Sequence, residues 1–403
     1  MPGKSLPQEF YVDPELFEED LARIFHANWL FAGHTCEVPE PGDYFVLPVG
    51  RESILVVRDK EGQLHAHFNV CRHRGSKIAT QPRGHCRSLV CPYHQWVYTL
   101  DGSLSNARLM GEGFDAGEYH LRSAAVREIS GLIFVCLSPE PPSLDLATEV
   151  IGPQLRPHGL ESAKIIRRDH YEVQANWKVI VENNRECYHC RVSHPEFCMS
   201  NYDLGLPGDT RGDEGYDATL EHEYERWQDL GLYPEEMSFP GGAPFRVSRL
   251  PLKEGFLTES LDGSLVAPLM GDIHDARTGS LRIITLPNFW AHANCDYAMT
   301  TRLLPAGPGL TNVEVCFLIR EDAVEGVDYD PQQVAAVWEA TCEQDWELCE
   351  NNYAGIESVA YEPGPFSDVT ENSVEDFACW YLDQLAEGEI AHASSQHNSS
   401  SRG

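Results

Sequence analysis

The chain has 403 residues, of which 42% are hydrophobic and 10% aromatic, enough for two or three domains with substantial cores. Its 63 acidic residues against 30 basic ones give a formal net charge of −33, so nucleic acid is a poor candidate partner, and the charge either favours cationic ligands or only keeps the protein in solution. No apolar run reaches the length of about 18 residues that a membrane span needs, and no secretory signal is recognisable. The thirteen cysteines lack the spacing of a small disulfide-rich domain, which predicts a cytoplasmic protein whose thiols are reduced or metal-bound.

A helix is predicted from Asp13 to His26. Asp13 can cap its first turn, and Pro14 suits the first helical position, where its missing N–H costs no hydrogen bond. The apolar side chains of this segment recur on one side, which predicts a buried face made of Leu16, Phe17, Leu21, Ile24 and Phe25.

From about residue 44 to residue 138 the pattern changes to short β segments separated by turns, which indicates a small antiparallel β domain. A proline-rich junction, residues 139–144, leads into a second region that mixes helices and strands, and the Ser/His/Asn-rich end is expected to be disordered. The predicted strands are Tyr44–Leu47, Ile54–Val57, His65–Val70, Trp96–Leu100, Gly131–Leu137, Leu281–Leu286 and Val313–Ile319.

Two Cys–His pairs lie within the β region. Cys71 and His73 form the first pair and Cys91 and His94 the second, with seventeen residues between the pairs. Two thiolates and two imidazoles suit Zn²⁺, or a [2Fe–2S] cluster in which two His replace two Cys on one iron. Because each pair mixes Cys with His, whereas zinc fingers usually pair like with like, the pattern favours the cluster. A cluster would colour the purified protein red-brown, and zinc would leave it colourless.

A second group of polar residues follows Asn176, which can cap a helix that we expect to continue to His189. Several polar groups on one helical face are costly to bury unless they have partners, and metal ligation would provide them. The residues that such a helix would place on one face are Val179, Glu182, Asn183, Glu186, His189 and Cys190.

His194 lies five residues after His189 and would be off that face. Pro195 follows it directly and disfavours helical geometry at His194, so the helix should end there and let the second imidazole turn back toward the first. Two alternatives remain: either histidine could be a hydrogen-bonded core residue, and Cys187 with Cys190 could form a redox or zinc pair.

The candidate third ligand lies far downstream. Asp330-Pro331 is typical of a helix start, and an apolar stripe at three-to-four spacing follows it. Asp345 interrupts that stripe, where a carboxylate is expected to be paired or metal-bound. Two His and one Asp make the facial triad that leaves coordination positions open for O₂ chemistry at Fe(II).

Both patterns resemble motifs of the Rieske non-haem iron oxygenase α subunits. C-x-H-x17-C-x2-H, followed by Arg74-Gly75 and by Gln95-Trp96, resembles the Rieske domain of ring-hydroxylating-type oxygenases, and E-x2-H-x4-H-P with a distant Asp resembles their mononuclear iron motif. The resemblance implies a [2Fe–2S] cluster and a mononuclear Fe(II), with O₂ as co-substrate. The implied cluster ligands are Cys71, His73, Cys91 and His94, and the implied iron ligands are His189, His194 and Asp345.

The resemblance also implies an α+β fold and an assembly. The expected parts are a helical segment at 1–43 that packs on the catalytic domain, a Rieske β domain at 44–140, a catalytic domain at 141–388 with an antiparallel sheet flanked by helices (a helix-grip, START-like fold), and a disordered tail at 389–403. Family members form trimers in which the cluster of one subunit faces the iron of the next. Glu186 falls at the position of the bridging carboxylate and would bond His189 in its own chain and His94 of a neighbour.

The segment Val181–His189 and the C-terminal region most resemble the branch of glycine betaine monooxygenases and stachydrine (proline betaine) demethylases. That branch implies O₂-dependent N-demethylation of a quaternary ammonium compound with release of formaldehyde. A quaternary ammonium has no N–H to donate, so aromatic faces would recognise it. Trp290 and His292, which point the same way on a strand, are candidates for such a wall, although Trp290 could equally be a core residue.

Two other functions fit parts of the pattern: the α subunit of an aromatic-ring-hydroxylating dioxygenase and a zinc-binding protein without turnover. The sequence has neither a dinucleotide-binding G-x-G-x-x-G after a strand nor a four-Cys ferredoxin signature. Electrons should therefore come from a separate partner, a flavin and [2Fe–2S] reductase that uses NAD(P)H.

Overall fold

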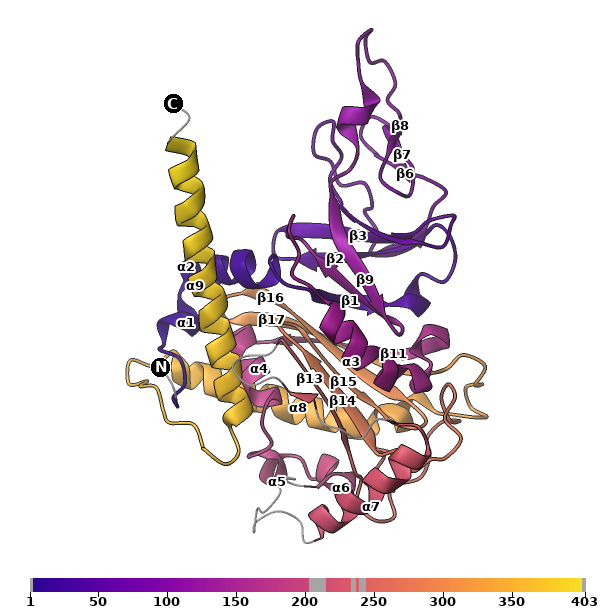
Figure 1. Ribbon diagram of the computed structural model, residues 1–403, viewed down its shortest axis with the longest axis vertical. Coiled ribbons are helices and arrows are strands. Elements are labelled where there is room, and N and C mark those ends of the chain that lie inside the picture. The colour runs from indigo at the N-terminus through magenta and orange to yellow at the C-terminus, as the bar shows by residue number, and fades with distance from the viewer. Residues whose placement is uncertain (1–2, 203–214, 233–236, 239–243, 401–403) are drawn as a thin grey trace. The chain divides into compact units, whose positions relative to one another are not determined.

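The computed structural model describes residues 3–202, 215–232, 237–238 and 244–400 (Figure 1). The chain divides into two compact units, Met1–Ile24 with Asp145–Gly403, and Phe25–Leu144. Among the helices of the described residues, none has the length and apolar character that a membrane crossing requires.

The unit Phe25–Leu144 contains a seven-stranded antiparallel sheet in the order β1-β10-β9-β4-β3-β2-β5. Its interior strand β3 is apolar at Ile54–Val57, where three of the four residues are β-branched, and all four are buried, as suits a strand covered on both faces. The strands are β1 Leu30–His34, β2 Asp43–Val49, β3 Glu52–Arg58, β4 Leu64–Phe68, β5 Arg83–His85, β9 Ser123–Ile129 and β10 Leu132–Cys136, with 3₁₀ turns η2 Thr35–Glu37 and η3 Ala116–Tyr119.

A smaller sheet of three strands, β6 Leu89–Val90, β7 Val97–Tyr98 and β8 Leu104–Asn106, lies in the same unit. The predicted strand Trp96–Leu100 is reduced to two residues here. The reason is local: the carbonyl of Trp96 closes a loop by accepting from Cys91 N, and Thr99 closes a turn with Ser103. The four other strands predicted in this unit lie within or around β2, β3, β4 and β10.

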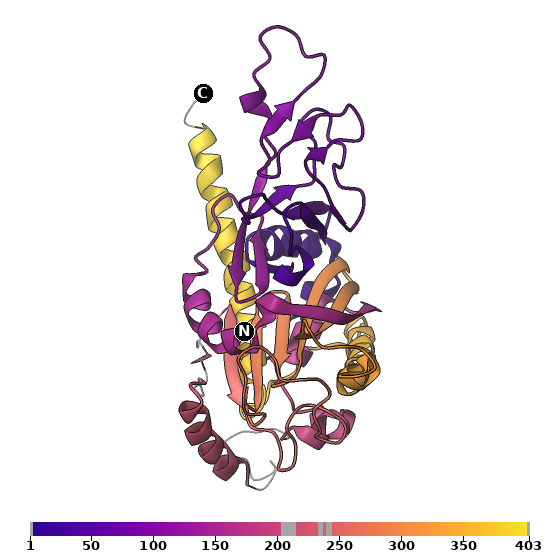
Figure 2. The ribbon, with the colours of Figure 1, turned by 90° about the vertical axis from the view of Figure 1, so that its right-hand side faces the viewer.

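The second unit is built on another seven-stranded antiparallel sheet, in the order β11-β17-β16-β15-β14-β13-β12. In Figure 2 helix α8 lies on one side of these strands and α3 on the other, so strands such as β15 are buried along their whole length. This is the predicted α+β arrangement of an antiparallel sheet with flanking helices. The strands are β11 Ala163–Val173, β12 Met237–Ser238, β13 Phe245–Leu250, β14 Ser280–Thr285, β15 Phe289–Ala293, β16 Ala298–Gly307 and β17 Leu310–Arg320.

The helices of this unit include the long α8, in which Asp330 caps the first turn by accepting from Gln332 N at 2.9 Å and Pro331 follows, as predicted. They are α1 Glu9–Val12, α2 Pro14–Glu19, η1 Asp20–Phe25, α3 Asp145–Leu155, η4 Arg156–His158, η5 Leu160–Ser162, α4 Trp177–Asn184, α5 Cys190–Ser193, α6 Phe197–Ser200, α7 Tyr216–Asp229, α8 Pro331–Ile356 and α9 Asn372–Ser400.

The boundaries differ from the expected ones in two places. The structure separates the N-terminal segment at Ile24, and β1 belongs to the unit that follows, where it pairs with β10. Helix α9 continues to Ser400, into residues for which the sequence predicts disorder, and residues 401–403 lie outside the described part. The stretch Ala386–Ala393 is rich in Ala and Glu, which favour a helix.

The predicted N-terminal helix begins as expected, with the Asp13 side chain accepting from Glu15 N at 2.7 Å. From Asp20 onward the chain widens into a π-helical turn, η1, which the sequence pattern did not predict. Within η1 the Asp20 carboxylate is fully buried and pairs with the buried ammonium of Lys178. It also accepts from Trp177 Nε1 at 2.9 Å and from the Tyr381 hydroxyl at 2.7 Å. One carboxylate therefore links the N-terminal segment to α4 and to α9.

We expect Asp20→Ala to lower the free energy of unfolding by about 3–5 kcal/mol, because it leaves the Lys178 ammonium buried without its partner. Denaturant unfolding followed by circular dichroism would measure the change. The double variant Asp20→Leu with Lys178→Met should recover much of it. Asp322→Ala, which breaks an exposed ion pair with Arg320, is the matched control. Equal midpoints for Asp20→Ala and Asp322→Ala would contradict the expectation.

Candidate metal centres and active-site cavity

Two loops of matching geometry carry the first set of predicted ligands. In each loop the Cys N–H bonds the carbonyl five residues on and the Cys carbonyl accepts from the N–H four residues on, over Cys71–Ser76 and again over Cys91–Trp96. The fourth residue after each Cys has a left-handed backbone, with φ of 78° at Gly75 and 58° at Gln95. Glycine suits this conformation, and the loop imposes it on Gln95 at a steric cost.

These loops bring their donors together in two layers. Cys71 and Cys91 are buried in the apolar core of the unit, whereas the two histidines are only half-buried. The Nδ1 atoms of His73 and His94 lie 3.2 Å apart. A buried pair of thiols with a pair of imidazoles nearer the surface fits a cluster whose two irons have different ligands.

Aromatic side chains support this arrangement. The ring of His73 stacks on Trp96 with centroids 4.8 Å apart, and the Tyr98 hydroxyl lies 3.4 Å from Cys71 Sγ and accepts from Arg72 N. Burial, with a contribution from the neighbouring Cys91, raises the pKa of the Cys71 thiol. Hydrogen bonds to a cluster sulfur ligand tune its potential, so Tyr98 is a supporting residue that the sequence did not single out.

The sequence predicted one continuous helix for the second set of ligands, but the structure does not have it. Helix α4 ends at Asn184, and Glu186, His189 and Cys190 therefore do not share a face with Val179 and Glu182. The side chain of Glu186 accepts from Tyr188 N and so stabilises a turn in place of the next helical turn. The predicted break before Pro195 is present, since His194 has the non-helical angles φ −123° and ψ 68°.

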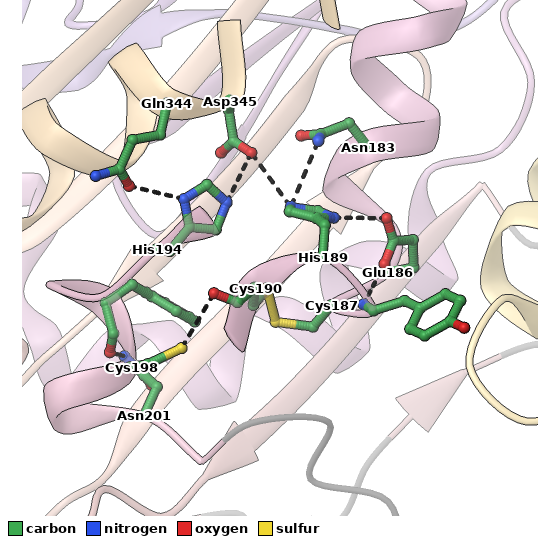
Figure 3. The surroundings of a disulfide bond; sticks show 12 residues. Asn183, Glu186, Cys187, His189, Cys190, His194, Cys198, Asn201, Gln344 and Asp345 are labelled. Atoms are coloured by element: carbon green, nitrogen blue, oxygen red, sulfur yellow. Dashed lines mark hydrogen bonds and ion pairs between the residues drawn. A yellow bond between two sulfur atoms is a disulfide. The ribbon is translucent and has the colours of Figure 1, made fainter. Parts of the chain in front are cut away.

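The turn and the break bring the predicted ligands together with Asp345 of α8 (Figure 3). Asp345 Oδ1 lies 3.3 Å from His189 Nε2 and 3.0 Å from His194 Nε2. Two imidazole nitrogens and one carboxylate oxygen thus face a common point, although some 150 residues separate the histidines from the aspartate.

The outer nitrogens of both rings have partners of their own. His189 Nδ1 lies 2.6 Å from Glu186 Oε1, the contact expected within the chain, and His194 Nδ1 lies 2.9 Å from Gln344 Oε1. Gln344 in turn donates to Glu196 Oε2 at 2.9 Å. Because an acceptor holds each Nδ1–H, each Nε2 carries the lone pair that a metal needs. The sequence analysis did not assign a role to Gln344, although it directly precedes Asp345.

The local electrostatics fit a cation at this point. His194 Nε2 and Asp345 Oδ1 are buried and close, yet neither has a well-aligned hydrogen-bond partner among the residues that the structure describes. Burial lowers the pKa of His189, but Asp345 and Glu186 outweigh it and raise the pKa to about 9. The pKa of His194 is also raised, chiefly by Asp345 against burial. The donor set therefore draws positive charge to the place where a divalent metal would supply it.

A cavity of about 550 Å³ opens beside these ligands. Trp290 and His292, the predicted substrate wall, both line it and are 8% and 9% exposed. His292 Nδ1 lies 3.1 Å from Oε1 of Glu259, a fully buried carboxylate. Burial raises the pKa of Glu259, but His292, Arg282 and Asn294 outweigh it and lower the pKa to about 2. Glu259 lies far from the metal motifs in sequence, which is why sequence reasoning missed it. Further lining residues include Phe197, Tyr202, Tyr216, Arg246, Arg282 and Trp338.

Cys187 and Cys190 form a disulfide, with Cα atoms 5.0 Å apart. The sequence analysis expected reduced or metal-bound thiols and kept a redox pair as an alternative. The structure has the pair oxidised, because the turn after Asn184 brings these two residues close and points both sulfurs along the same side of the loop (Figure 3).

Comparison with known proteins extends these observations. Residues 160–387 match the family model of the ring hydroxylating alpha subunit (catalytic domain), and residues 28–123 match the Rieske [2Fe-2S] domain. The chain is 42% identical, over 98% of its length and 88% of the relative, to the glycine betaine monooxygenase oxygenase subunit of Chromohalobacter salexigens. It is 40% identical, over 94% of its length and 89% of the relative, to the corresponding subunit of Pseudomonas aeruginosa.

Among solved structures, the fold is similar to that of the quaternary ammonium Rieske monooxygenase CntA in complex with L-carnitine. The TM-score is 0.72, with 95% of this chain and 96% of that chain covered at 21% identity. Naphthalene 1,2-dioxygenase from Rhodococcus sp. gives a TM-score of 0.68 at 20% identity, with 94% of each chain covered. At these identities the likeness shows the fold alone.

We expect Gln344→Leu to weaken Fe(II) binding at the mononuclear site about 10- to 100-fold, since His194 would lose the acceptor that orients its ring. Competition with a calibrated chelator would measure the affinity. Glu343→Gln changes the exposed neighbouring side chain and should leave the affinity unchanged. An unchanged affinity in Gln344→Leu would show that His194 needs no outer partner.

Proposed function

Because the chain belongs to the Rieske non-haem iron oxygenases, with a Rieske [2Fe–2S] domain and a mononuclear iron catalytic domain, we propose that it oxidises a small quaternary ammonium compound of the glycine betaine type. The family expected from the sequence is confirmed, and the Rieske match favours a cluster over zinc at Cys71, His73, Cys91 and His94. The proposed reaction hydroxylates one N-methyl carbon, and the carbinolamine then breaks down into formaldehyde and the demethylated amine.

The cavity is the observation that carries this proposal. It reaches from His189, His194 and Asp345 to a wall of aromatic side chains and to arginines, which are Arg185, Arg246 and Arg282. A betaine is a zwitterion, so it needs both kinds of contact: ring faces for the methylated cation and a guanidinium for the carboxylate. Arg282 is held in the lining, where it donates to Asn201 at 2.6 Å and its guanidinium lies 5.6 Å from the centre of the Phe197 ring.

His189, His194 and Asp345 would hold the iron, which in this family supplies O₂ activation with electrons from the cluster. The chain's own task is to orient. Glu186 and Gln344 fix the imidazole rings, and a substrate bound in the cavity would present a methyl group to the triad. No protein base is needed for the second stage, because a carbinolamine on nitrogen collapses without one.

We further propose a homotrimer in which Glu186 also bonds His94 of a neighbouring subunit. Glu186 is half-buried, and its Oε1 bonds His189. Its Oε2 accepts from Tyr188 N and could also accept from a second imidazole. A solved relative at 21% identity is described as showing inter-subunit electron transfer, which is the arrangement this contact would serve. Electrons would come from a separate flavin and [2Fe–2S] reductase.

A formaldehyde-release assay would test the function. The enzyme, loaded with iron and supplied with a reductase and NADH, is offered glycine betaine, proline betaine, carnitine and choline. We expect formaldehyde in proportion to substrate consumed, with the highest kcat/KM for a betaine. Turnover of naphthalene without formaldehyde from any methylammonium compound would instead support an aromatic-ring dioxygenase.

We expect Trp290→Ala to raise KM for the betaine roughly 5- to 30-fold, since a desolvated cation–π contact is worth about 1–2 kcal/mol. Trp290→Phe keeps a ring face and should raise KM far less, which separates the loss of the contact from a general loss of packing. Steady-state kinetics of the three proteins would measure both. A wild-type KM in Trp290→Ala would place the aromatic wall elsewhere in the cavity.

A further inference from the structure

The Cys187–Cys190 disulfide encloses only two residues, Tyr188 and the predicted iron ligand His189 (Figure 3). Cys190 is buried and Cys187 half-buried, and both line the cavity beside the metal ligands. The redox state of this pair is therefore coupled by the backbone to one of the imidazoles that would hold the iron.

The sulfur of Cys190 is itself placed as a donor. Cys190 Sγ and one ring nitrogen from each of His189 and His194 all lie within 4.8 Å of one another, a spacing that could hold a metal ion. Asp345 Oδ1 lies 3.0 and 3.3 Å from the Nε2 atoms of the same two rings. Cys190 is therefore a further donor beside the two imidazoles that Asp345 also approaches.

Sulfur changes the character of such a site. A thiolate is a strong, soft ligand, whereas a sulfur bonded in a disulfide is not available as a thiolate. A facial triad needs open positions for O₂, and a fourth strong ligand would occupy one of them. Two His, one Asp and one Cys is also a closed tetrahedral set that suits Zn²⁺.

We propose that Cys190 is a latent fourth ligand of the mononuclear iron site, which the disulfide to Cys187 prevents from binding the metal as a thiolate. In the oxidised pair the site has the oxygenase triad. In the reduced pair the Cys190 thiolate is free to bind, which closes the site to O₂ and favours Zn²⁺ over Fe²⁺. The inference rests on the iron centre of the proposed function but not on the identity of the substrate.

The redox step balances with partners of simple chemistry. A cellular dithiol reduces the disulfide by exchange and is itself oxidised to a disulfide. In the reverse direction, hydrogen peroxide takes two electrons and two protons from the two thiols, so that one S–S bond forms and two waters leave. Peroxide is what O₂ becomes when it accepts two electrons and two protons without substrate hydroxylation. Such unproductive turnover would therefore restore the disulfide.

Two single variants separate the roles of the sulfurs. Cys187→Ser leaves Cys190 as a permanent thiol next to His189 and His194, and Cys190→Ser removes that sulfur. Cys198→Ser is the matched control, because its thiol donates to the Cys190 carbonyl at 3.4 Å and is not in the disulfide. Each protein is prepared with its cluster intact and its mononuclear site stripped of metal.

The test is metal binding, not turnover. Co²⁺ is added, and the spectrum of the same protein before addition is subtracted, which removes the absorption of the cluster. We expect a thiolate-to-cobalt charge-transfer band in Cys187→Ser and none in Cys190→Ser. Zn²⁺ should bind about tenfold more tightly to Cys187→Ser than to Cys190→Ser. Wild type and Cys198→Ser should show the band only after reduction of the disulfide and lose it with peroxide.

The absence of the band in Cys187→Ser together with equal Zn²⁺ affinities in the two variants would overturn the proposal. A second contradicting result would come from peptide mapping. It would be that the peptide containing Cys187 and Cys190 always has the mass of the dithiol form and never the mass of the disulfide form, which has two hydrogens fewer, even after treatment with peroxide. Because neither readout needs a substrate, a failed formaldehyde assay would reject the proposed function and leave this inference standing.

Discussion

The catalytic unit depends on one constraint: the carboxylate of Asp345 must meet two imidazoles that come from a different part of the chain. Its Oδ1 lies 3.3 and 3.0 Å from the Nε2 atoms of His189 and His194. His194 Nε2 and Asp345 Oδ1 are buried and have no aligned hydrogen bond among the described residues, which is unfavourable alone, and a divalent cation would remove that cost. The long α8 fixes the carboxylate, so the histidines have to come to it. The end of α4 at Asn184 and the bend at His194 serve that requirement.

The rest of the catalytic unit holds this arrangement in place at two levels. Near the metal site, Glu186 and Gln344 bond the outer nitrogens of the rings and select the tautomer that presents Nε2 inward. Farther away, buried Asp20 joins Lys178, Trp177 and Tyr381, which ties the N-terminal segment to α4 and α9. A buried ion pair contributes little net stability, but it allows few alternative positions for the helix that leads into the metal loop.

The sulfur chemistry beside the site introduces a second requirement. An oxygenase iron needs open positions, and soft sulfur donors close them. This chain places Cys190 next to His189 and His194 and joins it to Cys187. In the site we propose, the same few residues would combine the ligands of an O₂ site with those of a zinc site, and a single covalent bond would separate the two. Cys187 and Cys190 both line the cavity, so a small oxidant or reductant that enters it would reach that bond.

Local signals in the sequence were enough to predict the two metal motifs, the caps Asp13 and Asp330, some of the strands and the bend before Pro195, because each depends on spacing and backbone preference over a few residues. The family followed from the same motifs. Only the tertiary structure decided where α4 ends, that Gln344 bonds the outer nitrogen of His194, and that Glu259 stands behind His292. It also decided that Cys187 and Cys190 join. The contacts of Gln344 and Glu259 join segments far apart in the chain, and periodicity along a single segment carries no information about them. The end of α4 and the Cys187–Cys190 bond depend instead on a local turn that helical periodicity does not reveal.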